Sequence, residues 1–195
     1  MRVIAGKYRS RPLRSLRGMD IRPTSDRLRE TLFNVLSPGN PNALLGTVWL
    51  DLFAGTGAVG IEALSRGAKQ VYFVENSPVA AEAIRKNLAS MGIVEGFTIL
   101  REESPRVLSR IKQQGVTADV VFLDPPYRMK DAYPKTLQLL AESSVIGATS
   151  IVIAEHEKKF DPGAEFGRIK RFRQLVQGST TLSFYRLENE ADLKA

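Results

Sequence analysis

Apolar and polar residues follow two periods along the chain, and these periods alternate from residue 47 onward. Short apolar runs predict strands near 47–51, 70–75, 97–101, 119–124 and 149–155. Helical spacing between these runs predicts helices near 58–66, 78–91, 104–114 and 132–142. Strands that alternate with helices are typical of an α/β fold with a parallel sheet. Two later extended stretches, near 167–172 and 179–187, predict a C-terminal antiparallel hairpin.

The first forty residues follow a different pattern. The segment 2–8 combines strand formers with a turn glycine, which predicts a small hairpin. A helix is expected to begin near 22–26, and its apolar positions share one face: Leu28, Leu32, Val35 and Leu36. The Pro- and Gly-containing stretch 38–42 then ends this helix.

Composition limits the possible classes of protein. The 195 residues, 43% of them hydrophobic, are enough for one domain with an appendage. We expect an N-terminal extension at 1–40, a main domain at 41–187 and a tail at 188–195. No apolar run has membrane-spanning length and no charged-then-apolar leader is present, so we expect a soluble, cytoplasmic protein. The absence of Cys and the single His exclude disulfides and thiolate chemistry, and they argue against a zinc site.

Positive charge is concentrated at the N-terminus. Residues 1–30 contain nine basic and three acidic side chains, so this segment supplies +6 of the total +7 and the other residues only +1. A basic arm on a near-neutral body predicts docking onto a polyanion. The alternative is a solubilising tail.

The strongest indication of chemistry lies where the apolar run 120–123 ends in Asp124, Pro125, Pro126 and Tyr127. Prolines fix φ and lack an N–H, so this turn is stiff and its carbonyl groups point outward. It suits a flat heterocycle with an exocyclic amine: Tyr127 can stack on the ring, while Asp124 and the Pro125 carbonyl accept the two amine protons. The stretch therefore predicts alkylation of a base amine. Taken alone, it fits an ordinary strand-ending turn equally well.

A second motif follows the run 48–50 and reads Asp51-Leu52-Phe53-Ala54-Gly55-Thr56-Gly57-Ala58-Val59-Gly60. Its glycines allow a tight turn and a close approach of the backbone to a ligand. The spacing matches the dinucleotide fingerprint. A carboxylate at position 51, however, would repel a pyrophosphate and attract the ammonium or sulfonium group of an amino-acid-bearing cofactor. The motif thus favours such a cofactor.

Acidic residues also end the next two predicted strands. Glu75, followed by Asn76, is placed to accept hydrogen bonds from both hydroxyls of a ribose. After the third strand, Glu102 or Glu103 can accept from an adenine amine, and Glu103 is the preferred candidate. Because acids in a first helical turn are also favoured by the helix dipole, a structural role suits this pair equally.

In this order the motifs are similar to those of class I S-adenosylmethionine-dependent methyltransferases acting on base amines. More closely, the chain resembles the bacterial RsmD family, from residue 2 to about 187. Three stretches carry this resemblance: Arg22-Pro23-Thr24-x-Asp26-Arg27-x-Arg29-Glu30-Thr31-Leu32-Phe33-Asn34, Asp51-Leu52-Phe53-Ala54-Gly55-Thr56-Gly57 and Phe122-Leu123-Asp124-Pro125-Pro126-Tyr127.

The resemblance implies a Rossmann-like class I methyltransferase fold with a mainly parallel, seven-stranded sheet. It implies transfer of a methyl group from S-adenosylmethionine to N2 of one guanine in 16S ribosomal RNA, within the small subunit or an assembly intermediate, by a monomer without metal. The cofactor would contact Asp51, Phe53, Ala54, Gly55, Gly57, Glu75, Asn76 and Glu103. The guanine would contact Asp124, Pro125, Pro126 and Tyr127, although the family more often has Phe at the last position. The RNA would contact Arg9, Arg11, Arg14, Arg22, Thr24 and Arg27.

Three other functions fit parts of the pattern. A DNA adenine or cytosine amino-methyltransferase would use the same turn, but 195 residues leave little room for a target-recognition region. A catalytically silent RNA-binding assembly factor would keep the fold, although the retained acids and glycines argue against it. A nicotinamide oxidoreductase is disfavoured by Asp51. His156, at the end of a predicted strand, fits a hydrogen-bonded structural residue better than a base.

Overall fold

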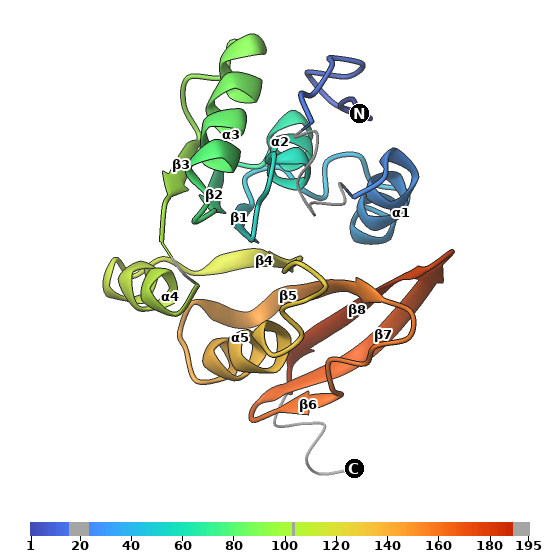
Figure 1. The fold of residues 1–195 in the computed structure, drawn as a ribbon, viewed down its shortest axis with the longest axis vertical. Helices are drawn as coiled ribbons and strands as arrows, with labels where there is room; N and C mark the ends of the chain where they lie inside the picture. Colours follow the sequence, from blue (N-terminus) through green and yellow to red (C-terminus); the bar gives the residue numbers. More distant parts are fainter. Residues whose placement is uncertain (16–23, 103, 189–195) are drawn as a thin grey trace. The chain divides into compact units, whose positions relative to one another are not determined.

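The computed structural model of the protein describes residues 1–15, 24–102 and 104–188. By its internal contacts the chain divides into two compact units, residues 1–103 and 104–195, coloured from blue to green and from yellow-green to red in Figure 1. Arg22 and Glu103, two residues assigned to the site from the sequence, lie outside the described residues.

The first unit is built on three parallel strands in the order β3-β2-β1: β1 (Val48–Leu52), β2 (Gln70–Val74) and β3 (Phe97–Leu100). Two connecting helices, α2 (Ala58–Ser65) and α3 (Pro78–Ser90), follow β1 and β2. The N-terminus of α3 is set by Ser77, whose side chain accepts from the Ala80 amide, and by proline at the first helical position. These bounds match the predicted ranges to within one residue.

Helix α1 (Asp26–Leu36) begins at Ser25, whose hydroxyl accepts from the Leu28 amide at 3.1 Å. Its buried residues are Leu28, Arg29, Leu32 and Phe33, so the predicted apolar face is right at Leu28 and Leu32. The face turns toward Phe33 because that ring stacks on the fully buried Trp49, with ring centroids 5.3 Å apart. Aromatic stacking therefore sets which side of α1 packs inward.

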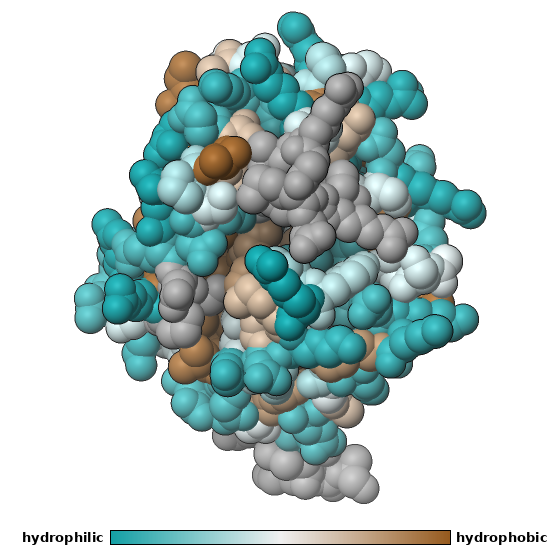
Figure 2. All heavy atoms as spheres, in the orientation of Figure 1, coloured by the Kyte–Doolittle hydropathy of each residue, from teal (hydrophilic) through white to brown (hydrophobic). Residues whose placement is uncertain are grey.

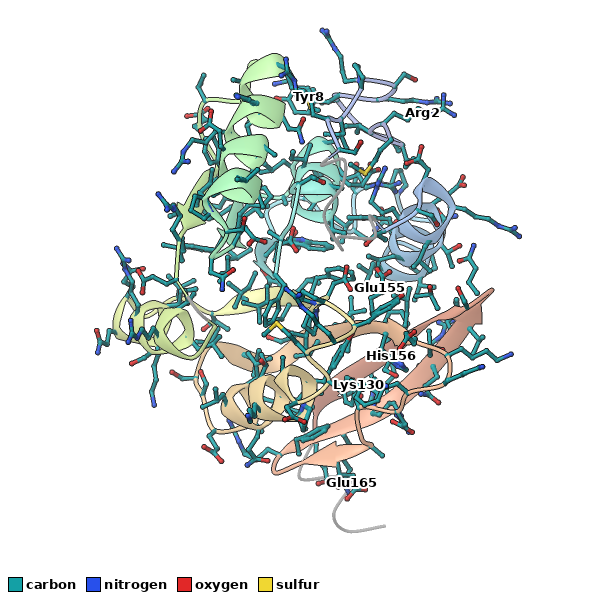
Figure 3. The ribbon with its side chains drawn as sticks, viewed as in Figure 1. Arg2, Tyr8, Lys130, Glu155, His156 and Glu165 are labelled. Carbon is teal, nitrogen blue, oxygen red and sulfur yellow. The ribbon has the colours of Figure 1, made fainter. Side chains whose placement is uncertain are left out.

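Residues 1–14 form a hairpin-like arm, as predicted, although it is held by a single antiparallel bridge between Arg2 and Pro12 rather than by strands. The Val3 amide donates to the Arg11 carbonyl at 3.0 Å, and the Ser10 amide donates to the Val3 carbonyl at 2.9 Å. Val3 and Leu13 are buried and anchor the arm to the unit. Arg2 and Tyr8 lie on it in Figure 3.

Helix α2 holds this arm through two buried polar side chains. The carboxylate of Glu62, which is 0% exposed, accepts from the amides of Ile4 at 2.7 Å and Ala5 at 3.0 Å. The Ser65 hydroxyl accepts from the Tyr8 amide at 3.0 Å. Arg66 donates to the same Glu62 carboxylate at 2.8 Å, so its charge is balanced. The arm is consequently part of the folded unit rather than a loose tail.

Gly6 permits this close docking. Its φ is +82°, and a Cβ at this position would lie 1.9 Å from the Ser65 carbonyl oxygen. Any other residue would have to adopt an unfavourable left-handed conformation and also displace the helix backbone. The turn glycine thus serves both the turn and the contact with α2.

The second unit contains two helices and five strands among its described residues. Helices α4 (Ser104–Gln113) and α5 (Ala132–Ala141) flank β4 (Ala118–Leu123) along the chain. The strand order is β4-β5-β8-β7-β6, with β5 (Ile146–Glu157) parallel to β4 and antiparallel to β8. Strands β7 (Ile169–Gln177) and β8 (Thr180–Leu187) form the predicted C-terminal hairpin.

The described residues therefore hold eight strands, one more than the seven predicted. The additional strand is β6 (Glu165–Phe166), which pairs only with Ile169 and Lys170. Two residues are too few to produce an apolar-polar alternation, so the sequence pattern could not show this strand.

Apolar side chains lie mainly in the interior of each unit. Hydrophilic residues cover most of the face drawn in Figure 2. None of the helices in the described ranges has the length and apolar character needed to cross a bilayer.

We expect the Glu62→Gln substitution to lower the free energy of unfolding by about 2 kcal/mol, because two charge-assisted hydrogen bonds to the arm are weakened and an amide NH2 would face a backbone N–H. Urea denaturation measures this loss, and limited proteolysis should show faster cleavage within residues 1–13. The matched control is Glu82→Gln on the exposed side of α3. Equal stability of the two variants would contradict the anchoring role of Glu62.

Candidate active site

The predicted site residues are divided between the two units. The first unit contains the glycine loop, residues 53–57, between β1 and α2. Phe53 has a φ of +61° and Gly57 a φ of +78°, so the chain turns sharply at both ends of the loop. The Ala54 amide donates to the Val74 carbonyl at 3.0 Å, and the Gly57 amide donates to the Ala54 carbonyl at 2.8 Å. The loop is thus fixed to the end of β2.

Asp51 lies under this loop and is only 2% exposed. Its Oδ2 accepts from the Gly60 amide at 3.0 Å, which ties the first turn of α2 to β1. A Cβ on Gly60 would lie 2.3 Å from the Phe73 ring, so glycine is needed for this approach. Burial raises the pKa of Asp51 to about 7, the Gly60 hydrogen bond opposes this rise, and the negative charge of Glu75 adds to it.

Glu75 follows β2 and connects two parts of the same unit. Its Oε2 accepts from the Gly55 amide at 2.9 Å, and its Oε1 accepts from the Ser77 amide at 2.8 Å. A carboxylate oxygen can accept more than one hydrogen bond, so each oxygen retains capacity for a ribose hydroxyl. Glu75 is half-buried and the neighbouring Asn76 is exposed. These groups fit the sugar of a nucleoside cofactor.

A buried amide that the sequence pattern did not identify joins the glycine loop to the arm. Asn87 on α3 is 0% exposed, and its Nδ2 donates to the Thr56 carbonyl at 3.0 Å. Its Oδ1 accepts from the Arg14 amide at 2.8 Å. The periodicity of α3 could have indicated a polar residue on an apolar face, between Ile84 and Leu88. It could not indicate the partners, because they lie far away in sequence.

The second unit holds the turn after β4. Asp124, Pro126 and Tyr127 are half-buried and Pro125 is buried. The Met129 amide donates to the Pro126 carbonyl at 2.7 Å and closes a tight turn. The acid, the carbonyl of Pro125 and the aromatic ring are therefore carried on a short, stiff piece of backbone.

Tyr133 of α5, which we did not single out from the sequence, supports this turn. Its hydroxyl donates to the Glu155 carbonyl at 2.7 Å and lies 3.5 Å from the Pro125 carbonyl oxygen. Burial first, and then the negative charge of Asp124, raise the pKa of Tyr133 far above its usual range, so it remains a neutral donor. Tyr133 lies on the apolar face of α5, so the hydrophobic periodicity predicts a core residue and does not indicate its polar contact.

His156 is a structural residue, as expected. It is buried beside Glu155 on β5, both labelled in Figure 3. Its Nδ1 lies 2.9 Å from the Glu157 carbonyl oxygen and must donate, because a carbonyl only accepts. Its Nε2 lies 2.8 Å from the Ser183 hydroxyl. Burial lowers the pKa of His156, so the neutral ring has both nitrogens engaged.

The described residues assigned to RNA contact differ in exposure. Arg9, Arg11, Arg14 and Arg27 are exposed. Thr24 is buried, and its carbonyl accepts from the guanidinium of Arg29 at 3.2 Å. The arginines are accessible to a ligand, whereas Thr24 contributes to the packing of α1.

Comparisons with known proteins assign the chain to a family. A family model described as "Conserved hypothetical protein 95" matches residues 1–186. Ribosomal RNA small subunit methyltransferase D of Haemophilus influenzae is 38% identical over 159 residues, which are 81% of this chain and 79% of that protein. The protein of the same name from Escherichia coli K12 is 30% identical over 195 residues, 100% of this chain and 94% of that protein. The chain belongs to the RsmD family.

A solved Escherichia coli structure, named "Putative methyltransferase yhhF", has a TM-score of 0.80 and 29% identity to this RsmD-family chain. The similarity covers 97% of this chain and 99% of that one. The predicted class I methyltransferase-like α/β fold is therefore confirmed, with eight strands among the described residues rather than seven. Within the described ranges, no three His, Cys, Asp or Glu side chains gather closely enough to hold a metal ion.

We expect Asp51 to make stability decline as pH rises from about 4 to about 7. Its folded pKa of about 7 exceeds the ordinary 3.8, so the folded protein keeps a proton that the unfolded chain has lost in this window. Asp51→Asn removes this titration and can still accept from the Gly60 amide. Relative to the parent, this variant should therefore gain roughly 1–3 kcal/mol of unfolding free energy between pH 4.5 and pH 7.5.

Urea denaturation at both pH values measures this difference, with Asp131→Asn, an exposed acid, as the control. If the unfolding free energies of Asp51→Asn and the parent change in parallel with pH, Asp51 is ionised in the folded protein at both pH values and the prediction is wrong.

Proposed function

We propose that the protein transfers the methyl group of S-adenosylmethionine to the exocyclic N2 of a guanine in 16S ribosomal RNA, within the small subunit or an assembly intermediate. The observation that carries this proposal is the stiff turn after β4, which holds Asp124, the Pro125 carbonyl and Tyr127 on one short segment. Membership of the RsmD family, whose relatives are named as small subunit ribosomal RNA methyltransferases, supports the reaction type and the substrate class.

The glycine loop and Glu75 are the residues that we propose hold the cofactor. S-adenosylmethionine supplies an electrophilic methyl group on a sulfonium. Glu75 has its two oxygens oriented by backbone amides, which suits a carboxylate that accepts from the two ribose hydroxyls. The backbone of Phe53, Ala54, Gly55 and Gly57 would line the methionine end, and Asn76 and Glu103 would contribute to the ribose and adenine ends.

Asp51 acts through the loop in this proposal. Its Oδ2 is engaged by the Gly60 amide. We infer that it positions the loop and, when the cofactor binds, provides the negative charge that offsets the ammonium or sulfonium group. A buried acid with a raised pKa can give up its proton when a cation arrives, because the cation restores the ionised form.

The turn after β4 would orient the methyl acceptor. Asp124 and the Pro125 carbonyl accept from the two N–H groups of guanine N2, and Tyr127 stacks on the flipped base. With N2 held in this way, its lone pair would be free to form the N–C bond as the C–S bond of the methyl donor breaks, which would give S-adenosylhomocysteine as the second product. The proton departs from N2 after transfer, and Asp124 stabilises the positive charge that N2 carries until then.

Tyr133 leaves the Pro125 carbonyl available in this scheme. Its hydroxyl is 2.7 Å from the Glu155 carbonyl oxygen but 3.5 Å from the Pro125 oxygen. The stronger bond therefore goes to β5, and the Pro125 carbonyl retains capacity for the substrate amine.

The arm is the part that we propose docks onto RNA. Arg9, Arg11 and Arg14 are exposed on a segment whose backbone is fixed to α2 and α3. Charges on a fixed backbone lose less conformational entropy on binding than charges on a tail. Arg27, exposed on α1, would add to the basic surface, and we propose from the sequence alone that Arg22 also contacts RNA.

Methylation of defined substrates tests the proposed reaction. The purified protein is incubated with labelled S-adenosylmethionine and, in parallel, undermethylated small subunits, naked 16S ribosomal RNA and genomic DNA. The modified nucleoside is then identified by mass spectrometry. N2-methylguanosine from subunits or RNA is the expected product. Label in DNA alone, or a different methylated nucleoside, would refute the proposal.

Asp124→Ala should lower the rate of methyl transfer by at least about 100-fold, because the acceptor amine loses its charged partner. Affinity for S-adenosylmethionine, measured by calorimetry, should stay within about twofold. Asp131→Ala removes an exposed acid from the same unit and should keep normal turnover. Near-normal methylation by the Asp124 variant would remove that residue from the mechanism.

Substitution of Arg9, Arg11 and Arg14 by Glu should weaken RNA binding by about tenfold or more. The slope of the logarithm of the binding constant against the logarithm of the salt concentration should become shallower by roughly two. Binding is measured by filter retention from low to moderate salt. The control reverses three exposed cations of the second unit, Arg106, Lys112 and Lys135. Identical losses in the two triple variants would mean that only net charge matters.

A further inference from the structure

A second concentration of positive charge lies in the C-terminal hairpin. Residues 169–187, which form β7 and β8, contain four basic side chains and no acid. Residues 1–30 contain nine basic and three acidic side chains, which leaves 15 basic and 18 acidic residues for the rest of the chain. The positive net charge of +7 is therefore confined to the arm segment and this hairpin.

On this hairpin, four side chains form a row in which two neighbouring aromatic rings lie between two arginines. We term this row the β7–β8 strip: Arg186, Phe172, Phe184 and Arg173. The Arg186 guanidinium lies 5.3 Å from the centroid of the Phe172 ring. The rings of Phe172 and Phe184 are 6.3 Å apart, and the Arg173 guanidinium lies 5.9 Å from Phe184. The rings hold both guanidinium groups in defined positions.

A β-bulge exposes Phe172, one of the two aromatic members of the strip. The register of β7 against β8 passes from Arg171 opposite Tyr185 to Arg173 opposite Phe184, so Phe172 is the extra residue. Phe172 is 45% exposed, while Phe184 beneath it is 1% exposed. A bulge re-aims side chains, and here it leaves a large ring on the surface beside two cations.

Two cations of this hairpin are engaged by acidic side chains. Lys170 pairs with Glu188 at 2.5 Å and Arg171 pairs with Asp161 at 2.5 Å, so both are neutralised. Arg173, by contrast, has no acidic partner within the described ranges, and its guanidinium lies over the Phe184 ring. An exposed ring flanked by arginines suits an unstacked nucleobase and its adjoining phosphates, since a base stacks on aromatic and guanidinium planes alike.

We propose that the β7–β8 strip is a second RNA-contacting surface, on which Phe172 stacks an unpaired base of the substrate RNA while Arg173 and Arg186 neutralise the phosphates beside it. This inference rests on the proposed function, because ribosomal RNA is the polyanion concerned. It assigns RNA contact to a part of the chain about 160 residues away in sequence from the arm.

Two variants separate stacking from charge. Phe172→Leu keeps an apolar cover over Phe184 but removes the exposed ring, and it should raise the Kd for naked 16S ribosomal RNA about fivefold with an unchanged salt slope. Phe172→Tyr keeps a ring and should bind within about twofold of the parent. Arg173→Gln combined with Arg186→Gln should lower the salt slope by about 1.4, which is the single-strand value for two phosphates.

The control for charge is Lys158→Gln combined with Lys159→Gln, which removes two exposed cations from a loop of the same unit and should change the Kd less than about twofold. Melting temperature and affinity for S-adenosylmethionine are measured on every variant and should match the parent. A Kd of Phe172→Leu equal to that of the parent would overturn the strip while leaving the proposed function standing. A change in the oligomeric state of the arginine double variant, with an unchanged Kd for RNA, would also overturn the strip. The arginines would then serve to prevent the exposed edge of β7 from pairing with a strand of another molecule.

A parent protein that neither binds nor methylates small-subunit RNA would overturn the proposed function together with this inference. The parent measurement is therefore made first, and the variants are compared only with its Kd and salt slope.

Discussion

Three buried polar side chains on α2 and α3 depend on the arm for their hydrogen bonds. Glu62, Ser65 and Asn87 face the interior, where a polar group without a partner costs about 1–3 kcal/mol. Main-chain groups of the arm provide most of their hydrogen-bond partners. In return, these side chains accept from backbone amides of the arm that are not paired in a strand. The arm and the three-stranded unit therefore stabilise each other, and neither is complete alone.

The acids at the ends of the strands have different environments. Asp51 is buried and holds the start of α2 through the Gly60 amide. Glu75 is half-buried, with its oxygens aligned by two amides, which suits the recognition of hydroxyl groups. Asp124 is half-buried on a turn stiffened by two prolines. In the proposed function these three acids thus serve positioning, binding and chemistry, respectively, each in a different hydrogen-bonding environment.

Local patterns in the sequence were sufficient for most elements. The strand-helix alternation located β1 to β5 and α2 to α5, and the motif at 51–60 located a loop with the expected sharp turns. What the sequence could not reveal are contacts between distant residues: Asn87 with Thr56, Glu62 with Ile4, and Tyr133 with Glu155. Each of these contacts is made by a polar side chain on a helix face whose other residues are apolar. The hydrophobic periodicity of the helix therefore does not indicate the contact. The predicted face of α1 failed at Val35 for the same reason, because the partner of Phe33 is Trp49.

The hydrogen bonds that attach the arm are made by its backbone, and the buried side chains of Val3 and Leu13 add apolar contacts. Glu62 and Ser65 bind main-chain amides of Ile4, Ala5 and Tyr8, and Asn87 binds the main chain at Arg14. Side chains at the exposed positions between these points can therefore vary without loss of attachment, provided that Gly6 is kept. If the arm docks onto RNA as proposed, its exposed residues can accordingly be redesigned to suit a different polyanion while the scaffold stays unaltered.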